Sequence, residues 1–354
     1  MASPRIAKKI YTARILGFND RFVVFDRCKK GALTIKTYDY YGKENKAIDY
    51  PIDTAGNVLI SLIKGDNCFG FTEDYIFFYF FTDTLNFSHS AEIPSQFSDQ
   101  YCINFYGNYD IKTLVFKDFI ICPIAPSHGI KNKKWKYASG VFIRNKKNYE
   151  PYMPLGLIDG VMKQSKAICL YEYPQICLNT HNNTILFSMQ GTEKIQVWKL
   201  DTSVKNPVKI FGSKGKHSKN SKLSRQNFQD MFNRHFSRYF HYRIENDLYE
   251  DIYYDSTHKF VYRTYRTAIK DTVYNRKIFH KNPINDNIRF QVRLEQSKPY
   301  GLQIYNSNYE LIYDEIMPTP FNILKIENNE IWVHGRYDEV NQKYWIYKYR
   351  IDFK

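Results

Sequence analysis

The side chains of this chain that could do chemistry are cations gathered in three short stretches, with aromatic rings and a histidine among them. The first stretch holds Lys131, Lys133, Lys134, Trp135 and Lys136, the second holds Arg234, Arg238 and His241, and the third holds Arg276 and Lys277. Cations concentrated in a small region attract anionic partners and speed their arrival. We therefore take these ten residues as candidate binding residues for an anionic partner.

Signatures of the common enzyme classes are absent from the sequence. It has no Gly-x-Ser-x-Gly, no His-Glu-x-x-His, no phosphate-binding loop of the Walker type and no Gly-x-Gly-x-x-Gly. The nine histidines are scattered, and the spacing of His235 and His241 is poor for two ligands on one helical face. The six cysteines form no Cys-x-x-Cys pair. We predict no metal site and no cofactor, and the catalytic residues, if there are any, stay unknown.

The formal net charge of +15 is concentrated in three insertions. Residues 125–137 carry +4, residues 211–243 carry +7 and residues 266–289 carry +4, so the rest of the chain is neutral on balance. Acidic residues that follow the second insertion offset part of its charge: Glu245, Asp247, Glu250 and Asp251. Lysine-rich loops that only keep the protein soluble are the alternative explanation.

Short strands must position these insertions. A polar residue followed by an aromatic or β-branched run recurs six times, beginning at Asp20, Asp74, Asp118, Asn183, His258 and Asn329. Such runs, bounded by Asn, Asp, Gly and Lys, favour strands over helices. Further apolar runs lie before and after most copies, and several alternate with period two, which is typical of strands with one buried face.

Four strands in each of six repeats predict a single all-β domain over residues 1–354, a six-bladed β-propeller with four-stranded blades. The last repeat ends after its third strand, so residues 5–13 are expected to supply the fourth strand and close the last blade. A two-sheet sandwich and a solenoid are the alternatives, and a solenoid would need capping units and more uniform repeats.

The three insertions, at 125–137, 211–250 and 266–289, occupy joints that emerge on the same face of a propeller. We therefore expect them to cluster on one rim and to form a basic face. Within the second insertion, residues 224–242 predict a helix, because Ser224 can cap it and its aromatic residues recur at helical spacing. This helix would cover the rim with its aromatic side and turn Arg234 and Arg238 outward.

Three segments resemble a Bacteroidetes family of six-bladed propellers that is classed as a domain of unknown function. The segments are Tyr173–Phe187, Asp251–Arg263 and Lys298–Glu310, and the similarity is strongest from about residue 165 to the end. Members of this family are usually exported lipoproteins, so the resemblance implies a periplasmic or cell-surface location. The first cysteine, Cys28, lies inside the first repeat, so this chain departs from the family by lacking a lipidation site.

The sequence favours a non-enzymatic binding or scaffold propeller whose basic face binds an anionic glycan, peptide or envelope protein. A lyase or hydrolase that acts on an anionic polysaccharide in the central channel is the alternative, with a Tyr or His moving the proton. A purely structural scaffold is a third possibility. Aromatic residues beside cations can also hold single-stranded nucleic acid, but the chain has no recognised nucleic-acid-binding module, so we do not expect that partner.

No run of 18 apolar residues predicts a transmembrane helix, and residues 1–9 lack the apolar stretch of a secretory signal. Either the start of the chain replaces a removed leader or the protein stays inside the cell. Cys169 and Cys177 flank the turn at Tyr173 and Pro174, and could pair in an oxidising compartment, whereas buried free thiols are the other reading. We expect a monomer.

Overall fold

The computed structural model describes residues 14–27, 32–51, 61–65, 67–73, 77–92, 101–102, 112–123, 125–126, 139–145, 151–157, 174–200, 206–218, 246–269, 298–318, 321–338 and 343–352. The chain divides into two compact units. Unit 1 comprises Met1–Lys131, Val141–Leu155 and Asn322–Lys354, and unit 2 comprises Asn132–Gly140 and Gly156–Phe321. The single-domain organisation stays a prediction.

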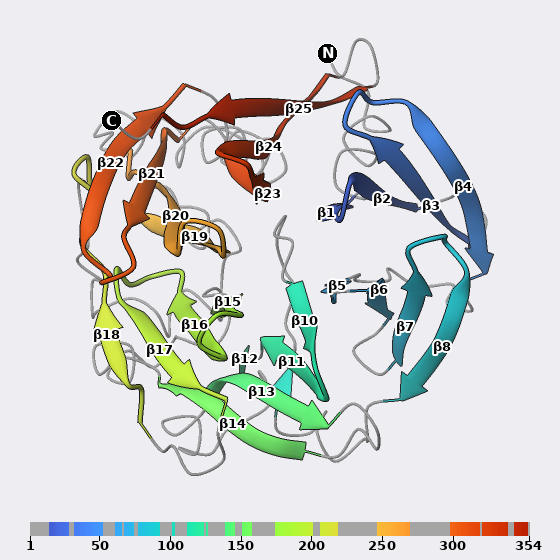
Figure 1. Ribbon diagram of the computed structural model, residues 1–354, viewed down its shortest axis with the longest axis horizontal. Coiled ribbons are helices and arrows are strands. Elements are labelled where there is room, and N and C mark those ends of the chain that lie inside the picture. The colour runs from blue at the N-terminus through green and yellow to red at the C-terminus, as the bar shows by residue number, and fades with distance from the viewer. Residues whose placement is uncertain are drawn as a thin grey trace, which may run out of the picture. The chain divides into compact units, whose positions relative to one another are not determined.

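Unit 1 contains two antiparallel sheets whose strands follow one another in chain order (Figure 1). Sheet I consists of β1 (Arg14–Phe18), β2 (Arg21–Arg27), β3 (Ala32–Asp39) and β4 (Glu44–Pro51). Sheet V consists of β23 (Asn322–Glu327), β24 (Glu330–Asp338) and β25 (Lys343–Arg350). Strands that pair with their sequence neighbours in this way form the blades of propellers.

A third, eight-stranded sheet, sheet II, also belongs to unit 1 apart from the first residues of β13 and the last of β14. Its first set consists of β5 (Ser61–Lys64), β6 (Cys68–Glu73), β7 (Phe77–Thr82) and β8 (Phe87–Glu92). Its second set consists of β10 (Lys112–Phe116), β11 (Phe119–Pro123), β13 (Ser139–Asn145) and β14 (Pro151–Leu157). The short strands β9 (Tyr101–Cys102) and β12 (Ala125–Pro126) pair as a separate ribbon.

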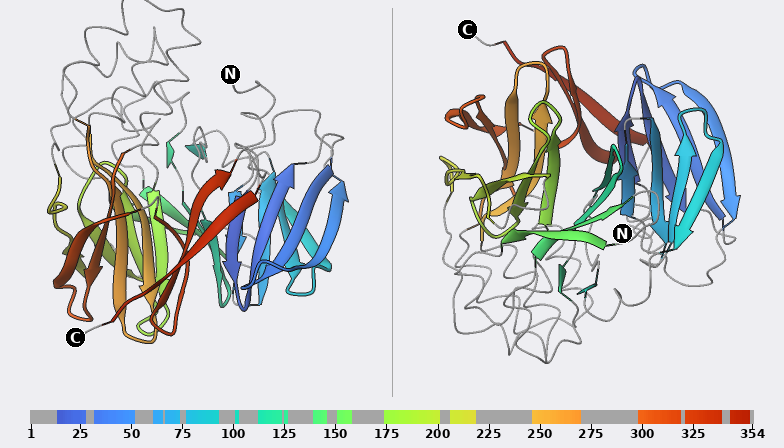
Figure 2. Two further views of the ribbon diagram at one scale, coloured as in Figure 1. Left: turned by 90° about the horizontal axis from the view of Figure 1, so that it is seen from above. Right: turned by 60° about the horizontal axis from the view of Figure 1, so that its bottom comes forward.

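Unit 2 contains two four-stranded antiparallel sheets, whose strands run alternately up and down (Figure 2). Sheet III consists of β15 (Pro174–Asn179), β16 (Thr184–Met189), β17 (Ile195–Lys199) and β18 (Lys209–Phe211). Sheet IV consists of β19 (Leu248–Asp255), β20 (Phe260–Arg266), β21 (Tyr300–Tyr305) and β22 (Leu311–Met317).

The all-β propeller predicted from the sequence is confirmed, but the prediction of six blades is wrong, because the described strands form five blade sheets. The physical reason is a parallel pairing between β5 and β10, with Lys112 opposite Leu62 and Leu114 opposite Lys64. These hydrogen bonds join the second and third predicted repeats into sheet II. Sheet V, for its part, has three strands rather than four within the described part of the chain.

No helix occurs among the described residues. The predicted helix over 224–242 and the predicted closing strand over 5–13 both fall outside the described residues. No helix of the described stretches is therefore long and apolar enough to cross a membrane.

The recurring polar residue of the sequence marks a tight turn between the first and second strands of a blade. Five such turns contain a residue with positive φ, and these are Asn19 (50°), Lys117 (52°), Asn183 (50°), Lys259 (59°) and Asn329 (64°). Asparagine tolerates this left-handed conformation better than most residues, which explains why polar residues recur there.

The repeat motif that was assigned to Asp74 precedes the third strand of its set, β7, whereas the other five motifs precede the second strand. The corresponding turn of that strand set lies between β5 and β6, where the Gly65 amide donates to the Cys68 carbonyl at 2.8 Å. The apolar run that follows this turn is interrupted by Gly70, whereas the run at Phe77–Thr82 is uninterrupted and gave the stronger pattern.

The first hairpin shows how period-two patterning builds the core of unit 1. On one face of β1 and β2, Leu16, Phe18, Val23 and Phe25 pack with apolar residues of sheet II. On the other face, Ile15, Phe22 and Val24 pack with Leu324 and Trp332 of sheet V. Because both faces are covered, these strands read as continuous apolar runs rather than as alternating ones.

The core of unit 2 lies between sheets III and IV. Leu186, Ile195 and Val197 of sheet III pack there with Ile252 and Val261 of sheet IV. All five side chains are almost fully buried. At one end of these two sheets the apolar core gives way to a cluster of buried polar side chains, described next.

Candidate functional site

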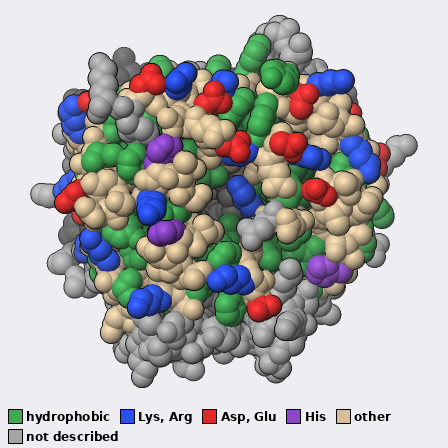
Figure 3. Space-filling view, viewed as in Figure 1, with side chains coloured by type: hydrophobic (Ala, Val, Ile, Leu, Met, Phe, Trp, Pro, Cys, Tyr) green, Lys and Arg blue, Asp and Glu red, His purple; other side chains and the backbone are tan. Residues whose placement is uncertain are grey.

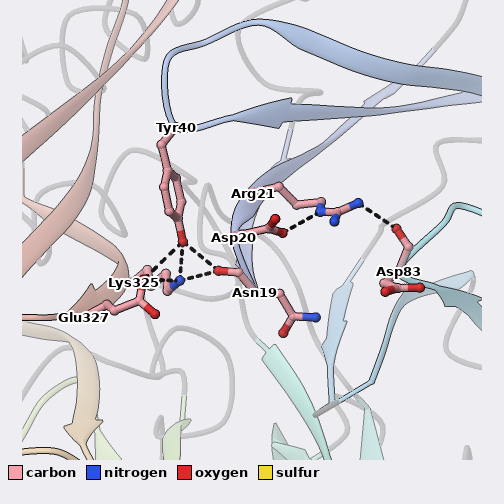
Figure 4. A network of polar contacts seen from close by, with 7 residues as sticks. All are labelled: Asn19, Asp20, Arg21, Tyr40, Asp83, Lys325 and Glu327. Carbon is pink, nitrogen blue, oxygen red and sulfur yellow. Dashed lines mark hydrogen bonds and ion pairs between the residues drawn. The ribbon is translucent and has the colours of Figure 1, made fainter.

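Two polar networks in the described residues are candidates for a functional site, one in each unit. The first joins strand turns of sheets I, II and V in unit 1 (Figure 4). The backbone carbonyl of Asn19 accepts hydrogen bonds from the Tyr40 hydroxyl, at 2.7 Å, and from the Lys325 ammonium. Arg21 donates to the Asp20 carboxylate at 2.9 Å and to the Asp83 carbonyl at 3.1 Å.

The ammonium of Lys325 is fully engaged within this first network. It donates to the Asn19 carbonyl and the Tyr40 hydroxyl, and it lies 2.7 Å from the Glu327 carboxylate. Burial acts to lower the pKa of Lys325, but the hydrogen bonds with Glu327 and Tyr40 outweigh it and leave that pKa above its ordinary value. An ammonium has three donors, so this network joins blades and offers no spare cation to a ligand.

A stack of rings and cations continues the same network into sheet V. The ring of Tyr40 stacks on Trp332 with 4.8 Å between centroids. Lys325 lies 4.9 Å from the centre of the Tyr40 ring, and Lys348 lies 5.2 Å from the centre of the Trp332 ring. Cation–π and stacking contacts stabilise the packing of neighbouring elements. The role that follows from this geometry is structural.

The second network lies in unit 2, at the end of sheets III and IV from which the second and third insertions leave. It begins with the segment 212–218, which follows β18 and which we call the 212–218 loop. Two backbone amides of this loop donate to tyrosine hydroxyls of sheet IV: Ser213 to Tyr305 at 3.1 Å and Gly215 to Tyr249 at 3.3 Å.

The tyrosines of sheet IV also fix the conformation of the loop. The ring of Tyr265 lies so close to Gly215 that a Cβ atom there would be 2.4 Å from it. The Lys216 amide donates to Asp314 at 2.8 Å, and the Lys216 ammonium donates to Glu315 at 2.6 Å. The segment that enters the second insertion is therefore held at successive residues.

Arg263 of β20 ties sheet IV to sheet III beneath this loop. Only 1% of the residue is exposed, and its guanidinium donates to the carbonyls of Thr192 and Glu193 and to the Ser188 hydroxyl. It also lies 4.0 Å from the centre of the Tyr249 ring. Burial lowers the pKa of Arg263, and no carboxylate of the described residues pairs with it. Neutral oxygens and a ring face therefore solvate this buried charge.

The tyrosines of this network are poor candidates for proton transfer. Burial raises the pKa of Tyr249 and Tyr305 above the ordinary value, and it raises that of Tyr265 together with the hydrogen bond to Asp314. A hydroxyl whose pKa is raised stays protonated at neutral pH, so none of the three can act there as a general base.

The described ends of the two insertions meet at Asp247. One carboxylate oxygen of Asp247 accepts a hydrogen bond from the Ser218 hydroxyl, at the start of the second insertion. The other accepts from the Ala268 amide at 2.7 Å, at the start of the third insertion. Asp247 is 5% exposed and Ala268 is 1% exposed. A single buried carboxylate therefore contacts the start of both insertions.

Other contacts close the same cluster, which we call the root cluster and define as Ser218, Asn246, Asp247, Glu250, Arg266, Ala268 and Lys298. The Lys298 ammonium, in the described segment that follows the third insertion, donates to the Asn246 carbonyl at 2.5 Å, near the end of the second. Arg266 and Glu250 form an ion pair with 4% and 3% of their side chains exposed. The described residues that lead into and out of the two insertions thus lie together in unit 2.

None of the ten binding residues predicted from the sequence can be placed relative to these networks. Lys131, Lys133, Lys134, Trp135, Lys136, Arg234, Arg238, His241, Arg276 and Lys277 all lie outside the described residues. They stay predictions. Among the described residues, no group of three His, Cys, Asp or Glu side chains could hold a metal ion.

The roles of Asp247 and Arg263 were not predicted from the sequence. Asp247 was expected only to offset the charge of the second insertion, but it also bridges the two insertions. Arg263 and Arg266 lie inside the run Phe260–Arg266, where every residue from 261 to 266 is buried. A charged residue inside an otherwise apolar strand could have indicated such a network, because a buried charge must have polar partners.

The comparisons with known proteins establish the fold alone. No family model and no curated protein matches the sequence. A solved member of the DUF4221 family from Bacteroides vulgatus superposes with a TM-score of 0.65 at 12% identity, over 96% of this chain and 93% of that one. A protein from Bacteroides fragilis whose name describes it as exported superposes with a TM-score of 0.50 at 8% identity, over 92% of this chain and 79% of that one.

Proposed function

We propose that this protein is a non-enzymatic binding propeller that uses its second and third insertions, rooted side by side in unit 2, to bind an anionic partner. The observation that carries the proposal is the root cluster, in which Asp247 contacts the start of both insertions. Two cation-rich segments that leave the molecule from one place create a local positive potential, and an anionic partner is attracted to it.

The charges outside the insertions support the proposal, because positive and negative charges balance there. Outside residues 125–137, 211–243 and 266–289 the chain is neutral on balance. Described cations are commonly paired there, as Lys36 is with Glu44 at 3.0 Å and Lys348 with Glu330 at 2.9 Å. On the face seen in Figure 3, described cations and anions are mixed. The unbalanced charge is therefore that of the insertions, including their candidate binding residues Arg234, Arg238, His241, Arg276 and Lys277.

The 212–218 loop supports the proposal in a second way. A binding segment loses less entropy on binding when the structure holds its ends in place. The loop donates backbone hydrogen bonds to Tyr305 and Tyr249, so the second insertion leaves from a fixed point. The first insertion, with Lys131 to Lys136, is proposed to add its charge to the same basic face.

Binding to heparin, a sulfated polysaccharide used as a probe of anion binding, tests the proposal. In one variant, Arg234, Arg238 and Lys277 become Gln. In a matched control, Lys43, Lys199 and Lys259 become Gln, since all three are exposed and outside the insertions. Exposed charges contribute roughly 0.5–1 kcal/mol each, so the insertion variant should bind about ten- to a hundredfold more weakly and the control about as well as the wild type.

The affinity of the wild type should also fall as salt rises, because exposed charges are screened within about 10 Å at 0.1 M salt. Equal losses in the insertion variant and the control would show that the insertions are not the binding element. An affinity that does not change with salt would contradict electrostatic binding altogether.

A location outside the cytoplasm is the accompanying proposal. It is supported by the resemblance to a family of exported proteins and by the likeness in fold to a protein whose name describes it as exported. Fractionation of cells that express the full natural gene tests it. Recovery in the periplasm or on the surface is expected, and recovery with cytoplasmic markers would contradict it.

A further inference from the structure

The 212–218 loop contacts all four strands of sheet IV, although it directly follows β18, the last strand of sheet III. Its partners lie on β19 at Tyr249, on β20 at Tyr265, on β21 at Gln303 and Tyr305, and on β22 at Asp314 and Glu315. No side chain of the loop belongs to the apolar core that the two sheets share. The loop therefore joins the two sheets through contacts that are separate from their core.

The contacts of this loop with sheet IV are mainly polar. Its sequence, Gly-Ser-Lys-Gly-Lys-His-Ser, contains no apolar side chain, and Gly215 is the one buried residue among the seven. Its partners on sheet IV are hydroxyls, an amide and two carboxylates, which water can hydrate when the loop leaves them. Segments with few buried apolar contacts open at a lower free energy than the core does. The loop can therefore detach from sheet IV without exposing the apolar core.

The groups that hold the loop form one hydrogen-bonded network, so its contacts are not independent. The Gln303 amide donates to the Ser213 carbonyl at 3.1 Å and to the Asp314 carboxylate at 2.9 Å. The Tyr305 hydroxyl donates to Gln303 at 3.0 Å, and the Tyr265 hydroxyl donates to Asp314 at 2.7 Å. Hydrogen bonds in such a network strengthen one another, so the loss of one weakens the rest. We therefore expect the contacts of the loop to form and break together.

Tyr265 contacts the middle of the loop in two ways. Its ring packs on Gly215, where a Cβ atom would lie 2.4 Å from the ring. Its hydroxyl acts through Asp314, whose other carboxylate oxygen accepts from the Lys216 amide at 2.8 Å. Tyr265 is fully buried in sheet IV, so it stays with the sheet when the loop moves.

The start of the loop has the features of a hinge. Phe211 stacks on Tyr309 with 4.5 Å between centroids and packs against the core of unit 2, so it is fixed. The next residue, Gly212, has a φ of 112°, a conformation that glycine adopts readily and other residues do not. A few such residues are enough to absorb the backbone rotation of a moving segment.

We infer that the 212–218 loop is a strap with two states, closed at rest as in this structure and open when it leaves sheet IV as one unit. Tyr265 is the positioning residue that holds the strap closed. The open state uncovers hydroxyl, amide and carboxylate groups of sheet IV while sheets III and IV stay packed. Opening requires no anionic partner, so this device is additional to the proposed function and is measured without a ligand.

Amide hydrogen exchange of the full chain, read at single residues by mass spectrometry with electron-transfer fragmentation, detects the open state. The amides of Ser213, Gly215 and Lys216 should share one opening equilibrium once the intrinsic exchange rate of each is taken into account. They should exchange at least about a hundredfold faster than the slowest amides of β16 and β20, which open only when the core does.

Tyr265→Phe separates opening as one unit from independent fraying. It removes the hydroxyl that donates to Asp314 and keeps the ring against Gly215. The Ser213 and Gly215 amides donate to other hydroxyls, those of Tyr305 and Tyr249. If the strap opens as one unit, all three amides should exchange faster by the same factor, about tenfold. Independent fraying would speed exchange at Lys216 alone.

Gly215→Ala and a matched control test the contact with the Tyr265 ring. Gly215→Ala should speed exchange of the strap amides about ten- to a hundredfold, because its Cβ meets the ring in the closed state. Lys216→Gln, in the same loop, removes an ion pair with Glu315 whose side chains are 59% and 46% exposed, and should change exchange by less than about fivefold. Exchange in β16 and β20 should stay at the wild-type rate in both variants, whereas general damage to unit 2 would speed it.

Three results would overturn the inference. The first is exchange of the strap amides as slow as that of the core strands, and the second is a Tyr265→Phe effect confined to Lys216. The third is a Gly215→Ala variant that exchanges no faster than Lys216→Gln. Heparin binding is a separate question, because a wild type that binds no heparin would contradict the proposed function and leave the strap unaffected.

Discussion

The buried guanidinium of Arg263 gives the sharpest prediction about stability. Its three hydrogen bonds, to Ser188, Thr192 and Glu193, join sheet IV to sheet III. Bonds from a charged donor contribute about 1.5–3 kcal/mol each, so the three together contribute roughly 4.5–9 kcal/mol. Burial of the charge costs several kcal/mol, and Arg263→Met removes that cost together with the bonds. We expect the variant to be about 3 kcal/mol less stable than the wild type.

Chemical denaturation monitored by tryptophan fluorescence measures this loss. Arg21→Met is the matched control, because the side chain of Arg21 is 26% exposed and pairs with an Asp20 side chain that is 75% exposed. The control should change stability by less than about 1 kcal/mol. In a double-mutant cycle, Ser188→Ala and Arg263→Met should be coupled by about 1 kcal/mol, since Ser188 accepts from the guanidinium at 2.6 Å. An Arg263→Met variant as stable as the wild type would refute the reasoning.

Three further predictions concern the same two networks. Gly301→Ala should lower the free energy of unfolding by about 1–3 kcal/mol, because the new Cβ would lie 2.2 Å from the buried ring of Tyr265. Thermal or chemical unfolding measures this loss, and a variant as stable as the wild type would show that the ring can move. Burial raises the pKa of Tyr249, Tyr265 and Tyr305, so stability should hold below pH ~10, where the unfolded tyrosines are protonated, and fall as the pH rises above it. An unfolding free energy that stays constant as the pH rises through ~10 would contradict this. Trp332→Ala should lower the free energy of unfolding by about 3–5 kcal/mol, because the ring packs against Phe22 and Tyr40. Lys348→Met should lower it by less than about 1 kcal/mol, because half of the Lys348 side chain is exposed. Equal losses in the two variants would contradict a packing role for Trp332.

The strands could be predicted from the sequence because their signal is local. Runs such as Arg21–Arg27 and Thr184–Met189 are apolar and β-branched or aromatic, and a turn that tolerates positive φ precedes each of them at Asn19 or Asn183. Periodicity and turn chemistry are properties of neighbouring residues, so one sequence carries them. The all-β class and the propeller follow from their repetition.

The number of blades could not be predicted, because it depends on a contact between distant segments. Leu62 and Lys112 belong to repeats that look separate, and only the parallel pairing of β5 with β10 joins them into one sheet. Nothing in the sequence of β5 or β10 shows whether the outer side of the strand pairs with another strand or stays unpaired. The root cluster could not be predicted for the same reason, since Ser218, Asp247 and Ala268 come together only through the packing of sheets III and IV.

Titration of heparin into the wild type and into the variant with Arg234, Arg238 and Lys277 changed to Gln tests the central claim most directly. We expect salt-dependent binding by the wild type and a loss of about ten- to a hundredfold in the variant, with the Lys43, Lys199 and Lys259 control unchanged. Binding of the insertion variant as tight as that of the wild type would contradict it.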